Sequence, residues 1–301
     1  MMNYNEFKES VSECIMYYLP EEYRDYKMEY INVNKAGHSY KGLVIAPKYN
    51  GTPVATPVIN MDLAYEQYLS GANMEDVFTD MANLRLSSEA NKPDEVNILD
   101  YAEASKHIVP RLINTAENAA YLADKPHRNI EDLSVTYVVR CLREQGMYDA
   151  NITDDLLRTW GITADELDAK ATENLYNGDY KLADIAAMAA HMPCELDIND
   201  INPDDYPAPL FVLSNPQITY GAVMALNYKL MDVLVEKFGD IYVLPSSVDE
   251  VIIVPKFMTN DAEYLKNMVT FVNGSSVDPE HKLSDHVYDY CKDRRRLNII
   301  A

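Results

Sequence analysis

Glycine is scarce in this chain, with 10 residues among 301, and the glycine-dependent loops that bind phosphate are missing. No G-x-x-x-x-G-K-[ST] or G-x-G-x-x-G run occurs, and neither does G-x-S-x-G or H-E-x-x-H. The sequence therefore carries no signature of a P-loop, a dinucleotide fold, a nucleophile elbow or a zinc protease.

Paired cysteines and long apolar runs are also missing. The four cysteines, Cys14, Cys141, Cys194 and Cys291, lie far apart and form no C-x-x-C motif, and such scattered thiols fit a reducing compartment. No apolar run approaches the roughly 20 residues of a membrane span, and the start MMNYNEFKES lacks the pattern of a secretory signal. We expect a cytoplasmic protein with no membrane partner.

Basic residues are outnumbered, because 26 lysines and arginines face 48 acidic residues, for a net charge of -22. A surface this negative repels phosphate backbones, so no nucleic-acid partner is expected, whereas a protein partner with a basic surface is favoured. Acidic side chains could instead mimic nucleic acid, although the basic residues are interspersed along the chain. The 23 tyrosines suit half-buried positions or recognition surfaces.

The first predicted region spans 1–92 and contains a helix, a hairpin and two further helices. Apolar residues at helical spacing predict a helix over 5–19, and two strand-like runs flank a turn at Lys35–His38, where Gly37 can take a positive φ. A second turn is predicted at Asn50–Gly51, and Asn60 or Asp62 is the expected cap of the next helix. The polar run NKPDEVN is the first candidate linker.

The middle region, 93–200, is predicted to mix helices and strands. HIVPRLIN is typical of a strand, and LSVTYVVRCLR is apolar enough on both faces to be a central strand. Thr163 and Glu166 form a capping box in front of a helix. A further helix is expected over 179–192, followed by an acidic, proline-containing linker.

The region 201–301 shows the clearest pattern, which predicts strand, helix and hairpin between Leu210 and Pro255. AVMALNYKLMDVLVEKF has one apolar stripe and predicts a single helix, which Gly239 ends, before the runs IYVLPSS and VIIVP. Two more helices are predicted over 264–272 and 279–296. The fold class expected is α+β, in several subdomains, with a C-terminal β-α-β-β unit whose helix packs on a small sheet.

One candidate for catalysis is the turn around His127, Arg128 and Glu131. An imidazole, a guanidinium and a carboxylate in one turn could orient a polar ligand or hold a general base. The alternative interpretation is that these side chains bind backbone carbonyls and neighbouring acids and so brace the loop.

A candidate for metal binding is the set His281, Asp285 and Asp289, four residues apart on the predicted helix. Side chains at this spacing share one helix face, where they could meet a divalent ion. The alternative is a solvated acidic face, and no cofactor is expected. The surface above the turn at Asp249 is a further place where function could lie.

A resemblance to known sequences is carried by three runs of the chain: IVPRLINTAENAAYLADKPHRNIEDLSVTY, NITDDLLRTWGITADELDAKATENL and YGAVMALNYKLMDVLVEKFGDIYVLPSSVDEVIIVP. In these runs the chain resembles a large family of uncharacterised proteins from anaerobic gut bacteria. From Asp154 through Val254 it also resembles a second uncharacterised family of cytoplasmic bacterial proteins. The resemblance implies an intracellular bacterial protein of mixed α+β fold and supplies no activity or catalytic residue.

The leading hypothesis from the sequence is a non-catalytic binding or adaptor protein, because catalytic signatures are missing while tyrosine and negative charge are abundant. The first alternative is an enzyme, hydrolase-like or metal-assisted, that uses the His127 region. The second alternative is an acidic mimic of nucleic acid.

Overall fold

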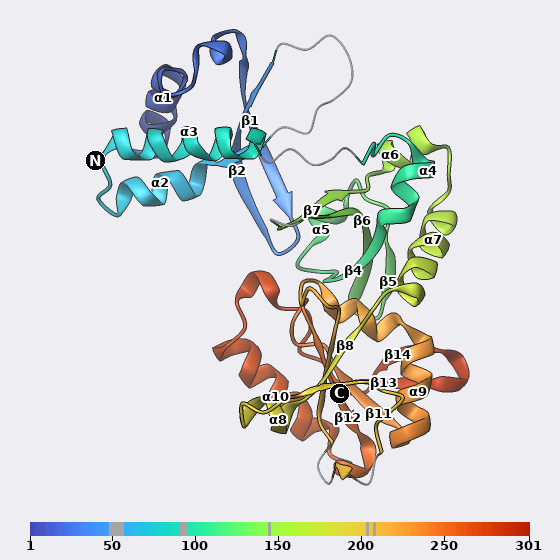
Figure 1. Ribbon diagram of the computed structural model, residues 1–301. Coiled ribbons are helices and arrows are strands. Elements are labelled where there is room, and N and C mark those ends of the chain that lie inside the picture. The colour runs from blue at the N-terminus through green and yellow to red at the C-terminus, as the bar shows by residue number, and fades with distance from the viewer. Residues whose placement is uncertain (48–56, 91–95, 144–145, 203–204, 207–208) are drawn as a thin grey trace. The chain divides into compact units, whose positions relative to one another are not determined.

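The computed structural model describes residues 1–47, 57–90, 96–143, 146–202, 205–206 and 209–301 (Figure 1). The predicted turn at Asn50–Gly51 and most of the predicted linker NKPDEVN lie outside these residues. The chain forms two compact units, Met1–Glu95 and Val96–Ala301. The predicted division into 1–92, 93–200 and 201–301 stays a prediction.

The first unit contains a three-stranded antiparallel sheet in the order β1-β2-β3. Lys35 pairs with His38 across the turn between β1 and β2, and Gly37 has a φ of 86°, so the predicted hairpin is confirmed. A positive φ is accessible to glycine without the steric penalty of a Cβ atom. The strands are β1 (Lys27–Lys35), β2 (His38–Ala46) and β3 (Val58–Asn60).

Three helices cover this sheet and supply most of the first unit's core. The side chain of Asn60 accepts hydrogen bonds from the amides of Asp62 and Leu63, which confirms the predicted cap. Phe7 on the first helix and Phe78 on the third are buried with Leu43 of the sheet. The helices are α1 (Tyr4–Cys14), α2 (Met61–Leu69) and α3 (Met74–Ala90).

The second unit contains a seven-stranded antiparallel sheet in the order β14-β13-β11-β12-β10-β8-β9. Its central strands β10, β11 and β12 come from the runs predicted as strands between Leu210 and Pro255, which confirms the predicted C-terminal unit within a mixed α+β fold. The strands are β8 (Lys181–Asp184), β9 (Glu195–Leu196), β10 (Phe211–Ser214), β11 (Ile241–Leu244), β12 (Val251–Pro255), β13 (Tyr288–Cys291) and β14 (Arg296–Ile299).

Helices α9 (Tyr228–Phe238) and α10 (Ala262–Ser275) lie on opposite faces of this sheet (Figure 1). Successive residues of a strand point to opposite faces. Accordingly, Val243 of β11 is buried in the core that contains α9, whereas its neighbour Leu244 is buried with Leu265 of α10. Both faces of the sheet are therefore covered by apolar side chains.

A smaller antiparallel sheet in the second unit has the order β4-β6-β5, and β7 also pairs with β6. The long strand β6 is central, as the sequence predicts. One of its faces joins the large core through Leu133, Val135 and Val139. The strands are β4 (Ile108–Asn114), β5 (Arg128–Ile130), β6 (Leu133–Arg143) and β7 (Gly146–Asn151).

Five further helices connect the strands of the second unit. The capping box of Thr163 and Glu166 is present at the start of α7, as predicted. No helix in the part of the chain that the structure describes combines the length and apolar composition needed to cross a bilayer. The helices are α4 (Tyr101–Ala104), α5 (Ala119–Leu122), α6 (Asp154–Trp160), α7 (Ala164–Asn177) and α8 (Ile185–Ala189).

The single helix predicted for AVMALNYKLMDVLVEKF is wrong. The run forms a 3₁₀ helix, η5 (Gly221–Leu226), and then α9, which begins after Asn227. The side chain of Asn227 caps α9 by accepting from the backbone amide of Leu230, and its Nδ2 donates to the Leu175 carbonyl at 3.2 Å. The apolar spacing does not reveal this break, because all residues of η5 are buried.

The helix predicted over 279–296 is also wrong. This segment forms a short 3₁₀ turn (Pro279–His281), then β13, a second 3₁₀ turn (Lys292–Arg294) and the start of β14. Tyr288 and Tyr290 are buried on one side of β13, an alternation of period two that overrides the acidic residues at helical spacing. The predicted helix over 179–192 is likewise replaced by β8 and the short α8.

Tyrosine hydroxyls donate hydrogen bonds to carboxylates in both units. These contacts help to satisfy half-buried carboxylates, two of which, Asp168 and Asp232, also bind an arginine. Burial and the carboxylate acceptor together raise the pKa of Tyr137, Tyr288 and Tyr290 well above the ordinary value of 10.0. The pairs are Tyr4–Asp62 at 2.8 Å, Tyr137–Asp168 at 2.7 Å, Tyr290–Asp232 at 2.7 Å, and Tyr288–Asp132.

Stability is therefore expected to fall at alkaline pH. The folded protein binds the tyrosine protons more tightly than the unfolded chain, so this contribution is complete below pH 10.0 and is lost as pH rises through the raised folded-state pKa values. Urea unfolding as a function of pH measures the loss. Tyr137→Phe should flatten the decline, whereas Tyr17→Phe, which changes a ring that is 87% exposed, should not. Identical curves for the two variants would contradict this assignment.

Candidate functional site

One face of the four-stranded assembly around β6 is buried but polar. Ser134, Thr136, Val138 and Arg140 alternate with the core residues of β6 and point to this second face. Three of the four are polar, and none is more than 9% exposed. A buried polar face needs internal hydrogen-bond partners, because water does not supply them.

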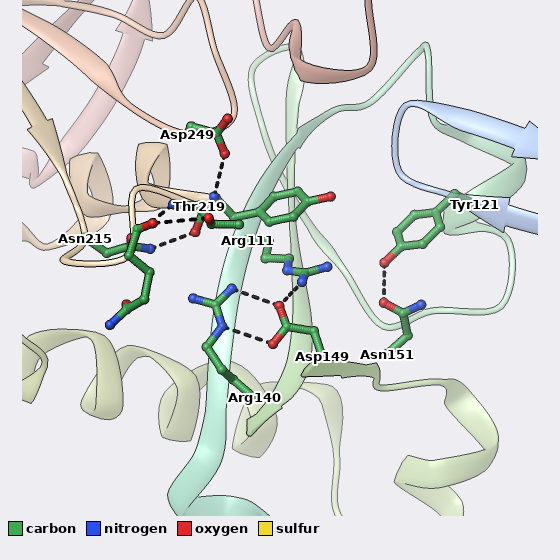
Figure 2. Close-up of polar contacts among 10 residues, drawn as sticks. Arg111, Tyr121, Arg140, Asp149, Asn151, Asn215, Thr219 and Asp249 are labelled. Carbon is green, nitrogen blue, oxygen red and sulfur yellow. Dashed lines mark hydrogen bonds and ion pairs between the residues drawn. The ribbon is translucent and has the colours of Figure 1, made fainter. Parts of the chain in front are cut away.

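Two arginines and one aspartate meet on this face (Figure 2). The register places Arg111 of β4 opposite Thr136, and Asp149 of β7 opposite Arg140, so all three charged side chains lie on the same side of the sheet. Arg140 binds Asp149 with two nitrogens, Nε to Oδ1 at 3.0 Å and Nη2 to Oδ2 at 2.9 Å. Nη2 of Arg111 contacts Oδ2 of the same carboxylate.

This cluster has more positive than negative charge. Two guanidinium groups share one carboxylate, and the three side chains are only 7 to 10% exposed. Arg111 Nε is buried and has no hydrogen-bond partner among the described residues. An unpaired N–H on a buried cation is unfavourable, so this Nε is a donor without an acceptor.

Tyr121 of α5 borders the cluster and donates a hydrogen bond to Asn151 Oδ1 at 2.8 Å (Figure 2). Burial is the main cause that raises the pKa of Tyr121 to about 12, although the Arg111 charge lowers it. Thr136 lies near the same hydroxyl and also lowers that pKa, but its buried Oγ1 makes no hydrogen bond of regular geometry. Tyr121 is therefore a neutral donor at physiological pH.

The ring of Tyr220 lies over the Arg111 guanidinium, with 3.9 Å between the ring centroid and Cζ. Tyr220 and Ile218 both have positive φ, 53° and 49°. Such backbone is uncommon outside glycine and is unfavourable for a β-branched residue. Strained backbone of this kind is maintained only where neighbouring contacts impose it, and it often accompanies binding sites.

Residues 215–220, between β10 and η5, are called the Tyr220 loop. The contacts that hold this loop are visible in Figure 2. Asn215 Nδ2 donates to the Thr219 carbonyl at 2.8 Å, and Asp249 Oδ1 accepts from the Tyr220 amide at 2.9 Å. Gly221 follows directly, and a Cβ there would lie 2.5 Å from the Asp249 carbonyl oxygen. The loop is thus tied to the turn between β11 and β12.

His127, Arg128 and Glu131 are placed near one another in the chain but contact different partners. His127 Nδ1 lies 2.8 Å from the Lys125 carbonyl oxygen, and Arg128 binds Asp168 at 3.2 Å. Glu131 binds Arg296 at 2.8 Å. These contacts do not bring the three side chains together on a common ligand position.

His281, Asp285 and Asp289 are not brought together, because the helix that would align them does not form. His281 binds Asp249 at 2.8 Å, Asp285 binds Lys282 at 2.7 Å, and Asp289 binds Lys256 at 3.4 Å. Among the residues that the structure describes, no three His, Cys, Asp or Glu side chains are grouped to hold a metal ion. His281 does take part in bracing Asp249, and through it the Tyr220 loop.

Sequence reasoning missed Arg111, Asp149 and Tyr220. One feature of the sequence does point to this site. Ser134, Thr136 and Arg140 alternate along a strand that is apolar enough to be central, and polar residues on a buried face need hydrogen-bond partners. The partners themselves come from separate strands and a distant loop, and no local pattern identifies them.

The fold and this cluster define an α+β protein with a buried cationic site. A family model described as "Family of unknown function (DUF5688)" matches residues 4–292. The chain belongs to this family. No curated protein and no solved structure matches the chain.

Replacement of Asp149 should reveal the charge imbalance. Asp149→Asn leaves two buried guanidinium groups without a carboxylate, so the free energy of unfolding should fall by about 3–5 kcal/mol. Adding Arg140→Gln removes one of these cations and should recover part of the loss. Urea unfolding measures both effects.

The matched control is Asp155→Asn, which removes the carboxylate of the exposed Arg158 pair, where Asp155 is 85% exposed. Such a surface pair contributes at most about 1 kcal/mol. If Asp149→Asn were no more damaging than this control, or if Arg140→Gln added a full further loss, the buried cluster would not hold surplus charge.

Proposed function

We propose that this chain is a non-catalytic binding protein whose ligand presents a carboxylate or phosphate group to Arg111. The observation that carries the proposal is the buried Arg111 guanidinium, which shares its carboxylate with Arg140 and keeps an unpartnered Nε. Guanidinium groups match the planar, multidentate geometry of these oxyanions better than any other side chain.

The charge of the whole chain makes this cluster unusual. With a net charge of -22, the protein repels polyanions over most of its surface. A surplus guanidinium in a site of low dielectric attracts an anion more strongly than an exposed one does. The combination favours a small anionic ligand, or a single anionic group, over a nucleic acid.

The neighbouring groups support binding rather than proton transfer. A general base works best with a pKa near the operating pH. The Tyr121 hydroxyl, which borders Arg111, has its pKa raised to about 12 and stays protonated. It could donate its one hydrogen bond to an oxyanion only by releasing Asn151, and it does not accept a proton from a substrate at neutral pH.

The Tyr220 loop is the cover of the proposed site. Its ring covers the face of the Arg111 guanidinium, whereas the N–H groups donate in the plane, so an anion that reached the buried Nε after movement of the loop would add a charge-assisted hydrogen bond. The positive φ values of Ile218 and Tyr220 provide backbone strain that loop movement can release. We also infer a bacterial cytoplasmic protein, an inference that the four free thiols support.

Thermal unfolding in the presence of sodium phosphate and sodium acetate tests the proposal, against sodium chloride at matched ionic strength. The chloride reference is essential because salt screens the repulsion within an acidic protein. A ligand at 100 times its Kd stabilises the folded state by about 2.7 kcal/mol, so at least one of the two anions should raise Tm by several degrees above the chloride reference.

Arg111→Gln should abolish this difference while leaving Arg140 and Asp149 as a neutral pair, so the variant is expected to fold. Arg158→Gln, in which the replaced side chain is 70% exposed, is the control and should respond like the parent. The proposal is wrong if neither anion exceeds chloride, or if Arg111→Gln responds as the parent does.

A further inference from the structure

Helix α10 carries a row of exposed apolar side chains along its outer face. Tyr264, Met268, Phe271 and Val272 recur at intervals of three and four residues, so they share one side of the helix. Phe271 is 74% exposed and Tyr264 is 58% exposed. We call these four side chains the α10 face. Large apolar residues gathered on a surface mark interaction sites more often than single exposed ones do.

Buried contacts and hydrogen bonds hold the helix that carries the α10 face in place. Leu265 and Val269, which lie beside it around the helix, are buried against the large sheet. Asn273 Nδ2 donates to the Ser284 carbonyl at 2.9 Å and to Asp285 Oδ1 at 2.8 Å. Asp261 caps the first turn by accepting from the Tyr264 amide at 2.9 Å. A preformed surface loses little conformational entropy when a partner binds.

Exposed carboxylates lie at both ends of the α10 face. Asp261 and Glu263 stand at its start, and Asp278 and Glu280 follow its end. Lys266 is the basic residue within the helix. The surroundings therefore carry the same negative sign as the chain as a whole, whose net charge is -22.

This charge decides between two kinds of occupant. A second copy would bring the same carboxylates toward one another and add another charge of -22, which opposes a symmetric dimer. An amphipathic helix with apolar residues on one side and lysine or arginine at its edges would fill the α10 face and neutralise the carboxylates.

We propose that the α10 face is the docking site for a basic amphipathic helix of a partner protein. The site is separate from the Arg111 cluster, and neither inference depends on the other. Apolar contact with Tyr264, Met268 and Phe271 provides the affinity, and the carboxylates at the two ends select a basic partner. An increase in ionic strength should therefore weaken binding without abolishing it.

The test uses two synthetic helical peptides of about 14 residues, a length at which an amphipathic helix forms on a surface. One contains leucine and lysine at amphipathic spacing, and the other has glutamate in place of every lysine. Fluorescence anisotropy with the full chain should show saturable binding of the lysine peptide and none of the glutamate peptide.

Met268→Ser combined with Phe271→Ser should weaken binding of the lysine peptide at least tenfold. The control, Tyr17→Ser combined with Leu63→Ser, also removes two exposed apolar side chains without altering net charge, and should bind like the parent. Unchanged thermal unfolding would show that both variants fold.

Three results would overturn the proposal. The first is equal loss of affinity in the α10 variant and the control, or no loss in either, since binding would then reflect general attraction to an acidic surface. The second is binding of the glutamate peptide as tight as that of the lysine peptide. The third is concentration-dependent self-association in sedimentation that Phe271→Ser abolishes, which would assign the face to a second copy.

Discussion

The carboxylate of Asp149, shared by two buried guanidinium groups, organises the polar side of the small sheet. Asp149 lies on β7, Arg140 on β6 and Arg111 on β4, so one ionic contact joins three strands. The buried polar face could not persist without it, because isolated buried charges are strongly unfavourable. The Tyr220 ring, and with it the loop that Asp249 holds, packs on the Arg111 side of this contact.

The excess of acidic residues over the whole chain makes the local surplus of positive charge at Arg111 unusual. With 48 acidic and 26 basic residues, carboxylates outnumber cations, and several accept from tyrosine, Asp168 and Asp232 in addition to an arginine. A tyrosine hydroxyl donates a hydrogen bond without adding positive charge, which accounts for part of the high tyrosine content. Against this excess of acidic residues, the two guanidinium groups that share the buried Asp149 carboxylate form a local surplus of positive charge.

Local signals in the sequence predicted much of the secondary structure. The Gly37 turn, the Asn60 cap and the Thr163 capping box each depend on residues within a few positions, and all three are present. The site depends on contacts between β4, β6, β7 and the Tyr220 loop, which are distant in sequence. Its residues could not be paired by spacing alone.

The errors in prediction have a similar physical origin. The spacing of His281, Asp285 and Asp289 fits a helix, but the burial of Tyr288 and Tyr290 on the large sheet imposes a strand, and this tertiary contact outweighs the local pattern. The break at Asn227 likewise reflects its hydrogen bond to the distant Leu175 carbonyl. Where a segment is buried against residues that are distant in sequence, its hydrophobic period and secondary-structure propensity are not sufficient to predict its structure.

The proposed function requires that the Arg111 guanidinium be available to an anion. Nitrogen-15 NMR of the arginine Nε–H groups tests it most directly, with the Arg111 resonance assigned by its absence in Arg111→Gln. Titration with phosphate at constant ionic strength should shift this resonance along a saturable curve, with smaller changes at Arg140. An Arg111 resonance that stays fixed throughout the titration would contradict the account.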